Sequence, residues 1–399
     1  MFGAGKIGRS FIGQLFSLGG YEVVFIDVFK PVIDELNLRH GYNIVIKGEM
    51  ESVITIQNVR GVFAGDVEKI SQEIASARIV AVSVGSTGLK SIAPMVADGL
   101  IKRYETAGAT PLDIIIAENL RNAAEFMHSE LKKFLPEGYP LDEQVGLIET
   151  SIGKMVPVMQ KRDMEEDILQ VFAEPYNTLI LDKLAFRNPI PEIEGLTPKD
   201  NIKAWVDRKL FIHNLGHAAA AYLGYLSHPD LSLLHEVLSD SKLKEIVCYT
   251  MLQAANILLK RYPGEFTVES LTDHIDDLLR RFQNKALGDT VYRVGCDLHR
   301  KLGTDDRLAG AIHLARESGL PYDLILKTLV CACHFRATDE SGNILPSDRE
   351  FVEIYTNGIE HVLTSICGFD RSVDCNLIDE AILIDNSLLH ESFIFAGDK

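Results

Sequence analysis

The chain has 399 residues, of which 46% are hydrophobic and 24% are charged, and its formal net charge is −17. This length is enough for two domains with well-filled cores, and the composition is typical of a globular protein. The acidic balance argues against nucleic acid and against an anionic membrane surface as partners, because both favour basic patches. A small anionic substrate would need a local basic pocket to overcome the repulsion.

The six cysteines all lie in the second half of the chain, and none of them form a Cys-x-x-Cys pair. This usage is typical of reduced core thiols in a cytosolic protein. Cys331, Cys333 and His334 stand close together but have no distant partner pair, so we predict no metal site. The chain has no long apolar run and no signal-like start. We therefore expect a cytoplasmic protein, which is either a monomer or a small homo-oligomer.

The first half of the chain alternates strand-like and helix-like segments. Runs rich in Val and Ile predict strands at 21–27, 78–85, 113–119 and 145–153. Helices are predicted at 6–18, 31–39 and 93–106. Such alternation predicts a parallel sheet with helices on both faces. Residues 43–47 and 52–57 interrupt the rhythm and predict an antiparallel pair around Gly48-Glu49.

The second half has long helical periods and few strand signals. Helices are predicted at 200–226, 230–238, 241–262, 267–283, 304–318 and 321–335, followed by a loop at 341–343 and one or two helices in the tail. Thr197-Pro198, followed by Lys199-Asp200, marks a helix start. The sequence thus predicts an α/β fold: a Rossmann-like doubly wound N-terminal domain over residues 1–197, then a mainly α-helical C-terminal domain over 198–399.

The start of the chain, Gly3-Ala4-Gly5-Lys6-Ile7-Gly8, has the spacing of a dinucleotide-binding turn. In such a turn the first glycine permits a tight bend, the second lets the backbone approach the pyrophosphate, and the third lets the helix pack on the strand. The N-terminus of the helix then directs free N–H groups at the phosphates. Gly3, Ala4, Gly5, Ile7 and Gly8 are therefore predicted to bind the cofactor.

Asp27 ends a predicted strand 19 residues after Gly8, where an acidic residue would bind the hydroxyls of the adenine ribose. Its charge would repel a 2′-phosphate, so the sequence favours NAD over NADP. The alternative is an aspartate that only starts a turn at the end of a strand.

Only Met1 and Phe2 precede the Gly-rich turn, although such a turn normally follows a central strand of the sheet. A missing central strand would open a slot in the core and leave the neighbouring ladders unpaired. We expect that the natural chain starts upstream of Met1; the alternative is a sheet that tolerates a short stub.

Near the middle of the chain, residues 208–217 bring together Lys209, Asn214 and His217. In an α-helix, Asn214 would lie about 140° and His217 about 80° round the axis from Lys209, so the three would share one broad face. A buried lysine can accept a proton, and asparagine and histidine can donate to an oxygen whose charge changes. The alternative is an amphipathic helix with three unrelated polar residues.

His213 and His217 also have the i, i+4 spacing of a zinc site. The glutamate that would act as the base in His-Glu-x-x-His is absent, because Asn214 occupies its place. We therefore predict that His213 is a supporting or packed residue, and that zinc hydrolysis is a weaker alternative.

These motifs together resemble the mannitol-1-phosphate 5-dehydrogenases, a subgroup of the long-chain polyol-specific dehydrogenases. The resemblance covers most of the chain and rests on the opening Phe2–Gly13, on the Lys-x4-Asn-x2-His arrangement, and on Ile92-Ala93-Pro94, Ala117-Glu118-Asn119, Met155-Val156-Pro157, Ala221-Tyr222-Leu223-Gly224, Arg300-Lys301-Leu302 and His334-Phe335-Arg336. It implies that Lys209 is the general base, that Asn214 and His217 position the reacting oxygen, that Asn119 contacts the cofactor, and that no metal is required. Two departures are Lys6, where the subgroup commonly has Asn, and Lys154, where Arg is frequent.

The resemblance implies NAD-dependent oxidation of a phosphorylated hexitol, mannitol 1-phosphate, to fructose 6-phosphate, and the reverse reaction. Arg300, Lys301 and Arg307 are candidates for binding the phosphate, although they could equally be helix-end charges on a solvated face. The same chemistry on an unphosphorylated polyol or a sugar acid remains open, because fold alone does not separate these substrates. A nucleotide-sensing protein without catalysis is less favoured, since the Lys209, Asn214 and His217 set is intact.

Overall fold

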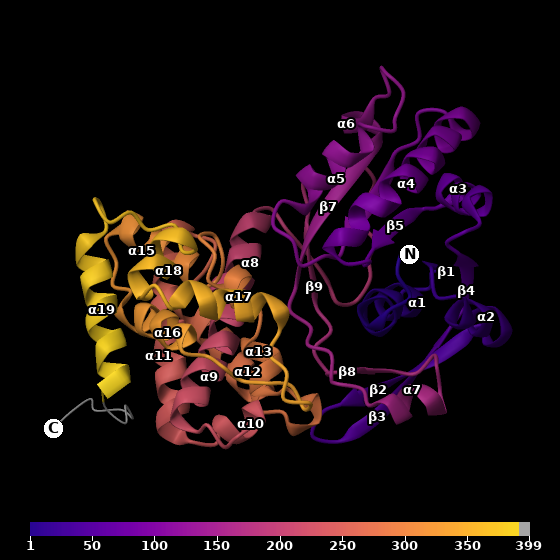
Figure 1. Cartoon of the computed structure of the whole chain (residues 1–399). Coiled ribbons are helices and arrows are strands. Elements are labelled where there is room, and N and C mark those ends of the chain that lie inside the picture. The colour runs from indigo at the N-terminus through magenta and orange to yellow at the C-terminus, as the bar shows by residue number, and fades with distance from the viewer. Residues whose placement is uncertain (391–399) are drawn as a thin grey trace. The chain divides into compact units, whose positions relative to one another are not determined.

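The computed structural model describes residues 1–390 of the chain. It contains two compact units, and the division between them falls between Val206 and Asp207. The first unit combines strands and helices, whereas the second is mainly helical (Figure 1). The predicted fold class, a Rossmann-like domain followed by a mainly helical one, is confirmed.

A mainly parallel sheet forms the centre of the first unit. Its strands are β1 (Val23–Asp27), β4 (Val59–Phe63), β5 (Ile79–Val82), β6 (Leu112–Ile116), β7 (Val145–Ile152), β9 (Leu179–Asp182) and β10 (Leu196–Lys199). One ladder has the order β10-β9-β7-β6-β5, in which only the β7–β9 pairing is antiparallel. A second ladder pairs β1 with β4 in parallel.

The four strands predicted in the first half are present as β1, β5, β6 and β7. Each is shorter than its predicted range, because the flanking residues bend into the loops at the ends of the sheet. The sequence analysis missed β4, β9 and β10. Arg60 and Gly61 interrupt the apolar pattern of β4, and β9 and β10 have only four residues each, which is too short for a periodic signal.

The single residue Phe2 connects the two ladders. It forms parallel bridges to Ile26 of β1 and to Val82 of β5. Its N–H donates to the Ala81 carbonyl oxygen at 2.8 Å, and its own carbonyl oxygen accepts from the Ser83 N–H at 2.9 Å. Phe2 therefore occupies the central strand position, at the point where the chain enters the Gly-rich turn.

Helices cover the sheet of the first unit. They are a π-helical turn η1 (Gly8–Gly13), α1 (Gln14–Leu18), α2 (Lys30–Arg39), α3 (Val67–Ser76), α4 (Ser86–Ala107), α5 (Ala123–Leu131), α6 (Leu141–Gln144) and α7 (Lys161–Glu166). The helices predicted at 6–18 and 31–39 are present. The helix predicted at 93–106 begins earlier, at Ser86, and continues through Pro94.

A small antiparallel pair, β2 (Gly41–Lys47) and β3 (Glu51–Gln57), packs beside this sheet. This confirms the predicted antiparallel pair around Gly48-Glu49. The third strand of the small sheet is β8 (Val171–Ala173), which pairs in parallel with β2 and was not predicted.

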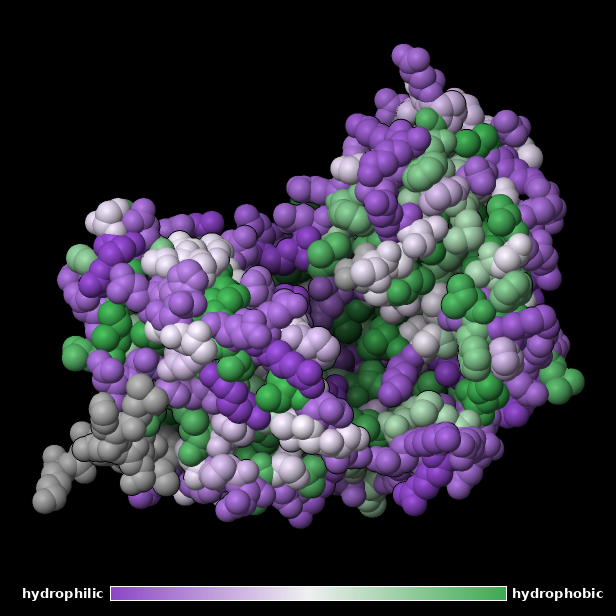
Figure 2. All heavy atoms as spheres, viewed as in Figure 1, coloured by the Kyte–Doolittle hydropathy of each residue, from purple (hydrophilic) through white to green (hydrophobic). Residues whose placement is uncertain are grey.

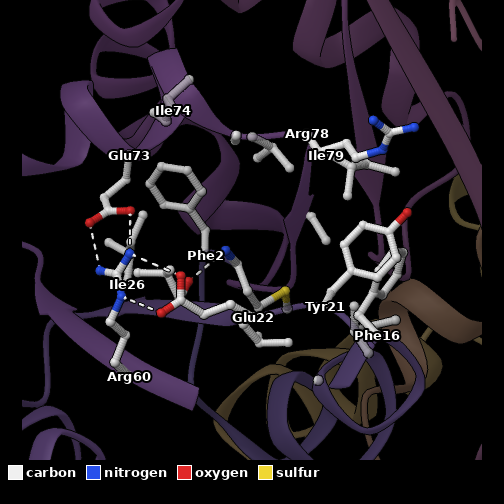
Figure 3. Close-up of a pocket in the computed structure, with 18 of the residues that line it drawn as sticks. Phe2, Phe16, Tyr21, Glu22, Ile26, Arg60, Glu73, Ile74, Arg78 and Ile79 are labelled. Atoms are coloured by element: carbon white, nitrogen blue, oxygen red, sulfur yellow. Dashed lines mark hydrogen bonds and ion pairs between the residues drawn. The ribbon is translucent and has the colours of Figure 1, made fainter. Parts of the chain in front are cut away.

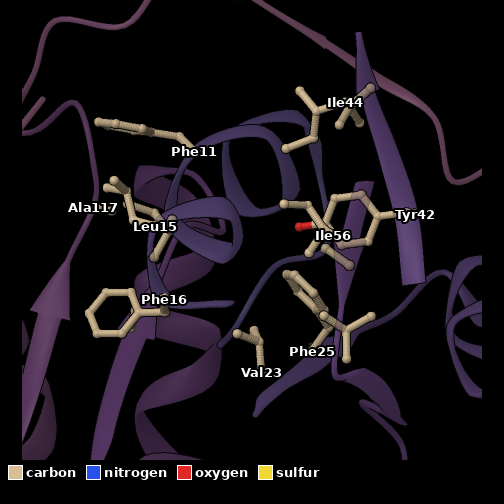
Figure 4. Packing of buried hydrophobic residues seen from close by; sticks show 14 of the residues in the cluster. Phe11, Leu15, Phe16, Val23, Phe25, Tyr42, Ile44, Ile56 and Ala117 are labelled. Atoms are coloured by element: carbon tan, nitrogen blue, oxygen red, sulfur yellow. The ribbon is translucent and has the colours of Figure 1, made fainter. Parts of the chain in front are cut away.

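The hydrophobic core of the first unit fixes the helix that follows the Gly-rich turn. Phe11, Leu15 and Phe16 of this helix pack with Phe25 of β1 and Tyr42 of β2 (Figure 4). The Phe25 and Tyr42 rings meet edge to face at 6.0 Å, and the Tyr42 hydroxyl donates to a backbone carbonyl of the helix at 2.7 Å. The start of this helix is therefore held from two sheets.

The second unit is a helical assembly. Its elements are the last residues of α8 (Ile202–Arg208), a π-helical turn η2 (Lys209–Asn214), α9 (Leu215–Ser227), α10 (Leu234–Val237), α11 (Ser241–Arg261), α12 (Val268–Phe282), a 3-10 turn (Lys285–Leu287), α13 (Val291–Gly295), α14 (Leu298–Lys301), α15 (Ala309–Ser318), α16 (Asp323–Cys333), α17 (Pro346–Tyr355), α18 (Ile359–Ser365) and α19 (Cys375–His390). The helix predicted at 304–318 begins only at Ala309. The described part of the tail contains three helices rather than one or two.

Helix α9 lies in the core of the second unit. Residues Ala218 to Tyr222 are fully buried, and α9 contacts α10, α11, α13 and α16. A Cβ on Gly224 would collide with Val237 of α10, so the neighbouring helix approaches the α9 backbone closely. The segment that carries Lys209, Asn214 and His217 therefore continues into the most tightly held helix of this unit.

Within the described residues, no helix is both long and apolar enough to cross a membrane. Hydrophilic side chains predominate on the visible face of the helical unit, where hydrophobic ones form small separate groups (Figure 2).

Candidate active site

The Gly-rich turn of the first unit depends on glycine at two positions and leaves space at a third. Gly3 has φ +91°, and a Cβ there would collide with the Ser83 carbonyl oxygen. A Cβ on Gly8 would collide with the Gly3 carbonyl oxygen, so the helix packs directly on the turn. A Cβ on Gly5 would meet no atom within 4 Å. The backbone at Gly5 is thus open to the approach of a ligand.

Asp27 is held beside this turn at the end of β1. Its Oδ2 accepts from the Ala4 N–H at 2.6 Å, and its Oδ1 accepts from the Phe29 N–H at 2.8 Å. The bond from Phe29 is the one expected if Asp27 only starts a turn at the end of the strand. The bond from Ala4 joins the carboxylate to the Gly-rich turn. A carboxylate has further acceptor capacity, so both roles fit the same geometry.

Glu118 organises the loop after β5. Its Oε1 accepts from the N–H groups of Val84 and Gly85 at 2.6 and 2.8 Å. Burial raises the pKa of Glu118, and these two hydrogen bonds oppose that rise. Asn119, the next residue, is exposed. Because the carboxyl ends of parallel strands meet at one edge, Asp27, Gly85 and Asn119 border the same edge of the sheet.

The second unit carries the predicted catalytic residues on a helix that is π-helical at this point. The turn η2 begins at Lys209 and ends at Asn214. A π-helix bonds residues five apart, so these two residues lie nearly one above the other. The predicted angle of about 140° between Lys209 and Asn214, which assumed a regular α-helix, is therefore wrong. The two side chains lie closer to one side of the helix than predicted.

Lys209 has the electrostatic environment of a proton acceptor. Burial is the largest cause that lowers its pKa to about 8, and the nearby Arg307 and Arg300 lower it further, whereas Asp306 raises it. About a tenth of the Lys209 side chains are then neutral at pH 7, and about half at pH 8. Arg307 is tied to the same helix, because its Nη1 donates to the Asn214 carbonyl oxygen at 3.5 Å.

His217 lies against an aromatic ring and close to a buried acid. Its ring stacks on Phe282 with centroids 4.6 Å apart and planes 11° from parallel. Its Nε2 lies 3.2 Å from Oδ2 of Asp289, whose side chain is 3% exposed and also pairs with Arg293. Burial is the largest cause of a pKa well below 6.5, and Arg293 adds to it. His217 is therefore neutral at pH 7.

The three predicted phosphate residues differ in their surroundings. Lys301 is buried, its Nζ donates to the Val294 carbonyl oxygen at 2.7 Å, and burial is the main cause that lowers its pKa to about 8. Arg307 is also buried and pairs with Asp306 at 2.8 Å. The Arg300 side chain is 58% exposed and pairs with two carboxylates. Lys301 and Arg307 both act on the pKa of His217, so these two lie in its surroundings.

Asp289 and Arg293 are candidate site residues that the sequence analysis missed. Their i, i+4 spacing, at the start of α13, is the pattern of a helical ion pair. That pattern gives no sign of proximity to His217, which lies more than 70 positions earlier in the chain. Only the packing of α13 against α9 reveals it.

His213 is buried and packs its ring against Phe282, with centroids 5.6 Å apart. Burial is the main cause that lowers its pKa well below 6.5. Over residues 1–390, no group of three or more His, Cys, Asp and Glu side chains could hold a metal ion.

Two family models match consecutive parts of this chain. The mannitol dehydrogenase Rossmann domain matches residues 1–195, and the mannitol dehydrogenase C-terminal domain matches residues 201–364. The chain belongs to the mannitol dehydrogenase family.

Two solved structures share the family fold over nearly the whole chain. A D-sorbitol dehydrogenase in substrate-free form has a TM-score of 0.82 and 18% identity, and the match covers 98% of this chain and 93% of the other. The Pseudomonas fluorescens mannitol 2-dehydrogenase, in a ternary complex with NAD and D-mannitol, has a TM-score of 0.77 and 18% identity over 98% and 91% of the two chains. This chain is thus an oxidoreductase of the mannitol dehydrogenase family, with the fold of both enzymes.

Proposed function

We propose that this protein is an NAD-dependent polyol-phosphate dehydrogenase that converts D-mannitol 1-phosphate to D-fructose 6-phosphate and back. The observation that carries the proposal is the arrangement of three residues. Lys209 has a pKa of about 8, and Asn214 follows it after one π-helical turn. His217, which is buried and neutral, lies three residues beyond Asn214. This set provides a proton acceptor and two groups that can hydrogen-bond an oxygen.

The first unit fits NAD in two respects. The open space beside Gly5, followed directly by a helix N-terminus, suits a pyrophosphate. Asp27 at the end of β1 suits the ribose hydroxyls and opposes the 2′-phosphate of NADP. The P. fluorescens enzyme holds NAD in its complex, which supports the same cofactor here. When bound, the cofactor would supply the hydride chemistry, as NAD⁺ in oxidation and as NADH in reduction.

In oxidation, Lys209 acts through its neutral amine, which takes the proton from the substrate hydroxyl. In reduction, its ammonium form returns that proton to the forming alkoxide. The Asn214 amide donates to this oxygen and stabilises the charge that develops on it, and the neutral His217 imidazole helps to position the substrate. Oxidation should therefore speed up as pH rises through about 8, whereas reduction should slow down.

The phosphate preference is supported by the local balance of charge. Although the chain has a net charge of −17, His217 is surrounded by Arg293, Lys301 and Arg307. Lys301 is the strongest phosphate candidate of these three cations, because its Nζ donates to the neutral carbonyl group of Val294 rather than to a carboxylate. Such a cluster would attract a dianion into an otherwise acidic protein.

An unphosphorylated polyol or a sugar acid is the second candidate substrate. Asp306 already pairs with both Arg300 and Arg307, and Asp289 pairs with Arg293, so three of the cations have carboxylate partners. The two similar solved structures also bear the names of dehydrogenases of unphosphorylated polyols. Both observations favour this alternative.

The test is a cofactor-reduction assay on mannitol 1-phosphate, mannitol, sorbitol and a panel of sugar acids, with and without a chelator. We expect kcat/KM to be highest for mannitol 1-phosphate and the chelator to have no effect. A higher value for an unphosphorylated polyol or an acid would select the alternative. Lys301→Ala should raise KM for mannitol 1-phosphate more than for mannitol, and equal changes would remove Lys301 from the phosphate site.

A second assay tests the cofactor. The parent enzyme should prefer NAD, and Asp27→Ala should relax that preference, because it removes both the ribose acceptor and the repulsion of a 2′-phosphate. A parent enzyme that already prefers NADP would contradict the role proposed for Asp27.

A further inference from the structure

The place of Lys301 in the second unit depends on a short helix. This helix, α14, has four residues, from Leu298 to Lys301, and it follows α13 after Cys296 and Asp297. A helix this short is not stable by itself, because its N–H and C=O groups find few partners within the helix. Contacts from other helices must therefore hold it. We call residues 295–301 the α13–α14 corner.

The N-terminus of α14 is capped by a carboxylate from another helix. Asp297, at the N-cap position, has φ +74°, and its side chain pairs with Arg300 instead of capping the helix. Asp348 of α17 provides the cap. Its Oδ2 accepts from the Asp297 N–H at 2.9 Å, and its Oδ1 accepts from the Leu298 N–H at 2.7 Å. Asp348 is 3% exposed, so a buried carboxylate uses both oxygens to fix two successive peptide groups.

Two aromatic residues hold the start of the α13–α14 corner. The hydroxyl of Tyr222, a fully buried residue of α9, donates to the Gly295 carbonyl oxygen at 3.0 Å. A Cβ on Gly295 would collide with the ring of Phe335, so this ring packs directly on the backbone. The corner is thus fixed at its first residue by α9 and Phe335, and at the start of α14 by α17.

Lys301 folds back along the α13–α14 corner. Its Nζ donates to the Val294 carbonyl oxygen at 2.7 Å, and the residue is 7% exposed. Its charge acts on His217, so the ammonium group lies in the surroundings of that histidine. A displacement of α14 would therefore move a buried cation of the candidate active site.

Helix α17 is itself anchored at its other end. The Tyr355 hydroxyl donates to Oδ1 of Asp385 in α19 at 2.8 Å and lies 3.1 Å from Nε2 of His334. Phe351, between Asp348 and Tyr355 in the sequence, is fully buried. Asp348 therefore reaches α14 from a helix that is held along its length.

We propose that Asp348 is a positioning residue, which fixes the first turn of α14 and thereby the place of Lys301 in the candidate active site. The inference rests on the proposed function, in which Lys301 binds the substrate phosphate. A charge-assisted hydrogen bond depends on short distances and good alignment, so a displaced ammonium group would bind a phosphate less well. Because Asp348 acts through Lys301, its loss should weaken phosphate binding rather than proton transfer at Lys209.

The experiment is a double-mutant cycle of Asp348→Asn and Lys301→Ala. Asparagine has the shape of aspartate but only one acceptor oxygen, so one of the two N–H groups loses its partner. We expect Asp348→Asn to raise KM for mannitol 1-phosphate about tenfold, and to change kcat and KM for mannitol and NAD by less than about twofold. In the Lys301→Ala background, Asp348→Asn should raise KM for mannitol 1-phosphate no further.

Two control variants separate positioning from a general loss of stability. Asp374→Asn changes another buried carboxylate of the second unit, which accepts from the Asp370 N–H at 2.7 Å and pairs with Arg316. Glu73→Gln weakens an ion pair of the first unit, where Glu73 lies 2.6 Å from Arg60 (Figure 3). Both variants should lower Tm and leave every KM unchanged.

Tyr222→Phe tests the α13–α14 corner even where Asp348→Asn does not fold. It removes the hydrogen bond to Gly295 and keeps the ring, so KM for mannitol 1-phosphate should rise by about two- to fivefold, with mannitol little affected. Hydrogen exchange in a peptide that contains residues 297–301 should be at least threefold faster in Asp348→Asn and unchanged in Asp374→Asn.

Three results would overturn the inference. In the first, Lys301→Ala raises KM for mannitol 1-phosphate but neither Asp348→Asn nor Tyr222→Phe does, and the proposed function then stands without it. In the second, the effects of Asp348→Asn and Lys301→Ala are additive, so that Asp348 does not act through Lys301. In the third, Lys301→Ala leaves this KM unchanged, and the phosphate role of Lys301 in the proposed function fails as well.

Discussion

The helix that follows the Gly-rich turn and the helix that carries Lys209 both contain a π-helical turn with key residues five apart, but they use it differently. In η1 the end residues are Gly8 and Gly13, and a Cβ on Gly13 would lie 2.6 Å from the Phe25 ring and 2.8 Å from the Gly8 carbonyl oxygen. In η2 the end residues are Lys209 and Asn214, whose side chains are the proposed functional groups. The first turn brings backbone close to other atoms, whereas the second aligns side chains.

The Gly-rich turn therefore requires the absence of side chains, whereas the Lys209 region requires side chains and the residues that contact them. The Gly-rich turn depends on local space, which glycine spacing alone signals. The Lys209 and His217 site depends on burial and on Arg307, Asp289 and Phe282, which come from later segments of the chain. Substitutions in the first region should therefore act on folding and cofactor affinity, and those in the second on turnover and its pH dependence.

The largest effect is expected from Lys209→Ala. Loss of the general base should lower kcat by about 10²–10⁴-fold. NAD affinity, measured by fluorescence titration, should change little, because the cofactor residues belong to the other unit. Near-normal turnover of the variant at pH 7 would exclude Lys209 as the base.

The next effect is expected from Gly8→Ala, with Gly5→Ala as the matched control. A methyl group on Gly8 would collide with the Gly3 carbonyl oxygen and should lower the free energy of unfolding by about 1–3 kcal/mol. A methyl group on Gly5 meets no atom and should leave Tm unchanged while it weakens NAD binding. Thermal melts and NAD titrations give both readouts. Equal Tm losses would show that the space beside Gly5 is not open.

Asp289→Asn should have a smaller effect on catalysis. The carboxylate fixes His217, so its loss should reduce kcat by about tenfold, equivalent to about 1.4 kcal/mol, with a smaller change in KM. Asp273→Asn, an exposed acid on α12, serves as the control and should retain full activity. Steady-state kinetics of both variants decide the matter, and unchanged kcat in Asp289→Asn would remove Asp289 from the site.

The smallest effects are two opposite shifts in the pH profile of oxidation. Arg307 lowers the pKa of Lys209 and Asp306 raises it. Arg307→Ala should therefore move the rise in rate to higher pH, and Asp306→Asn should move it to lower pH, each by a fraction of a pH unit. Profiles of kcat/KM against pH measure both. Shifts in the same direction would mean that Lys209 does not control the profile.

Much of the first unit was predictable because its signals are local. Apolar runs identified β1, β5, β6 and β7, and the antiparallel pair of β2 and β3 was identified from its alternating residues. Strands such as β8 and β9 escaped because a strand of three or four residues gains its stability from its neighbours rather than from its own pattern.

In the second unit the candidate catalytic residues were predicted from their spacing and by resemblance, but their surroundings were not. The sequence did not indicate that residues 209–214 are π-helical, because one extra residue in a helical turn leaves no periodic trace over six positions. Nor did it separate the buried Lys301 from the exposed Arg300, since both belong to one short basic run and only the packing of α14 distinguishes them.

The sequence by itself determined the fold class, the family and the residue types of both site regions, because periodicity, glycine spacing and the Lys-x4-Asn-x2-His arrangement are local properties of the chain. Only the tertiary structure decided the pKa of Lys209 and the proximity of Asp289 to His217. Burial, ion pairs and cavities arise where distant segments meet, and their energies depend on distances that no stretch of sequence contains.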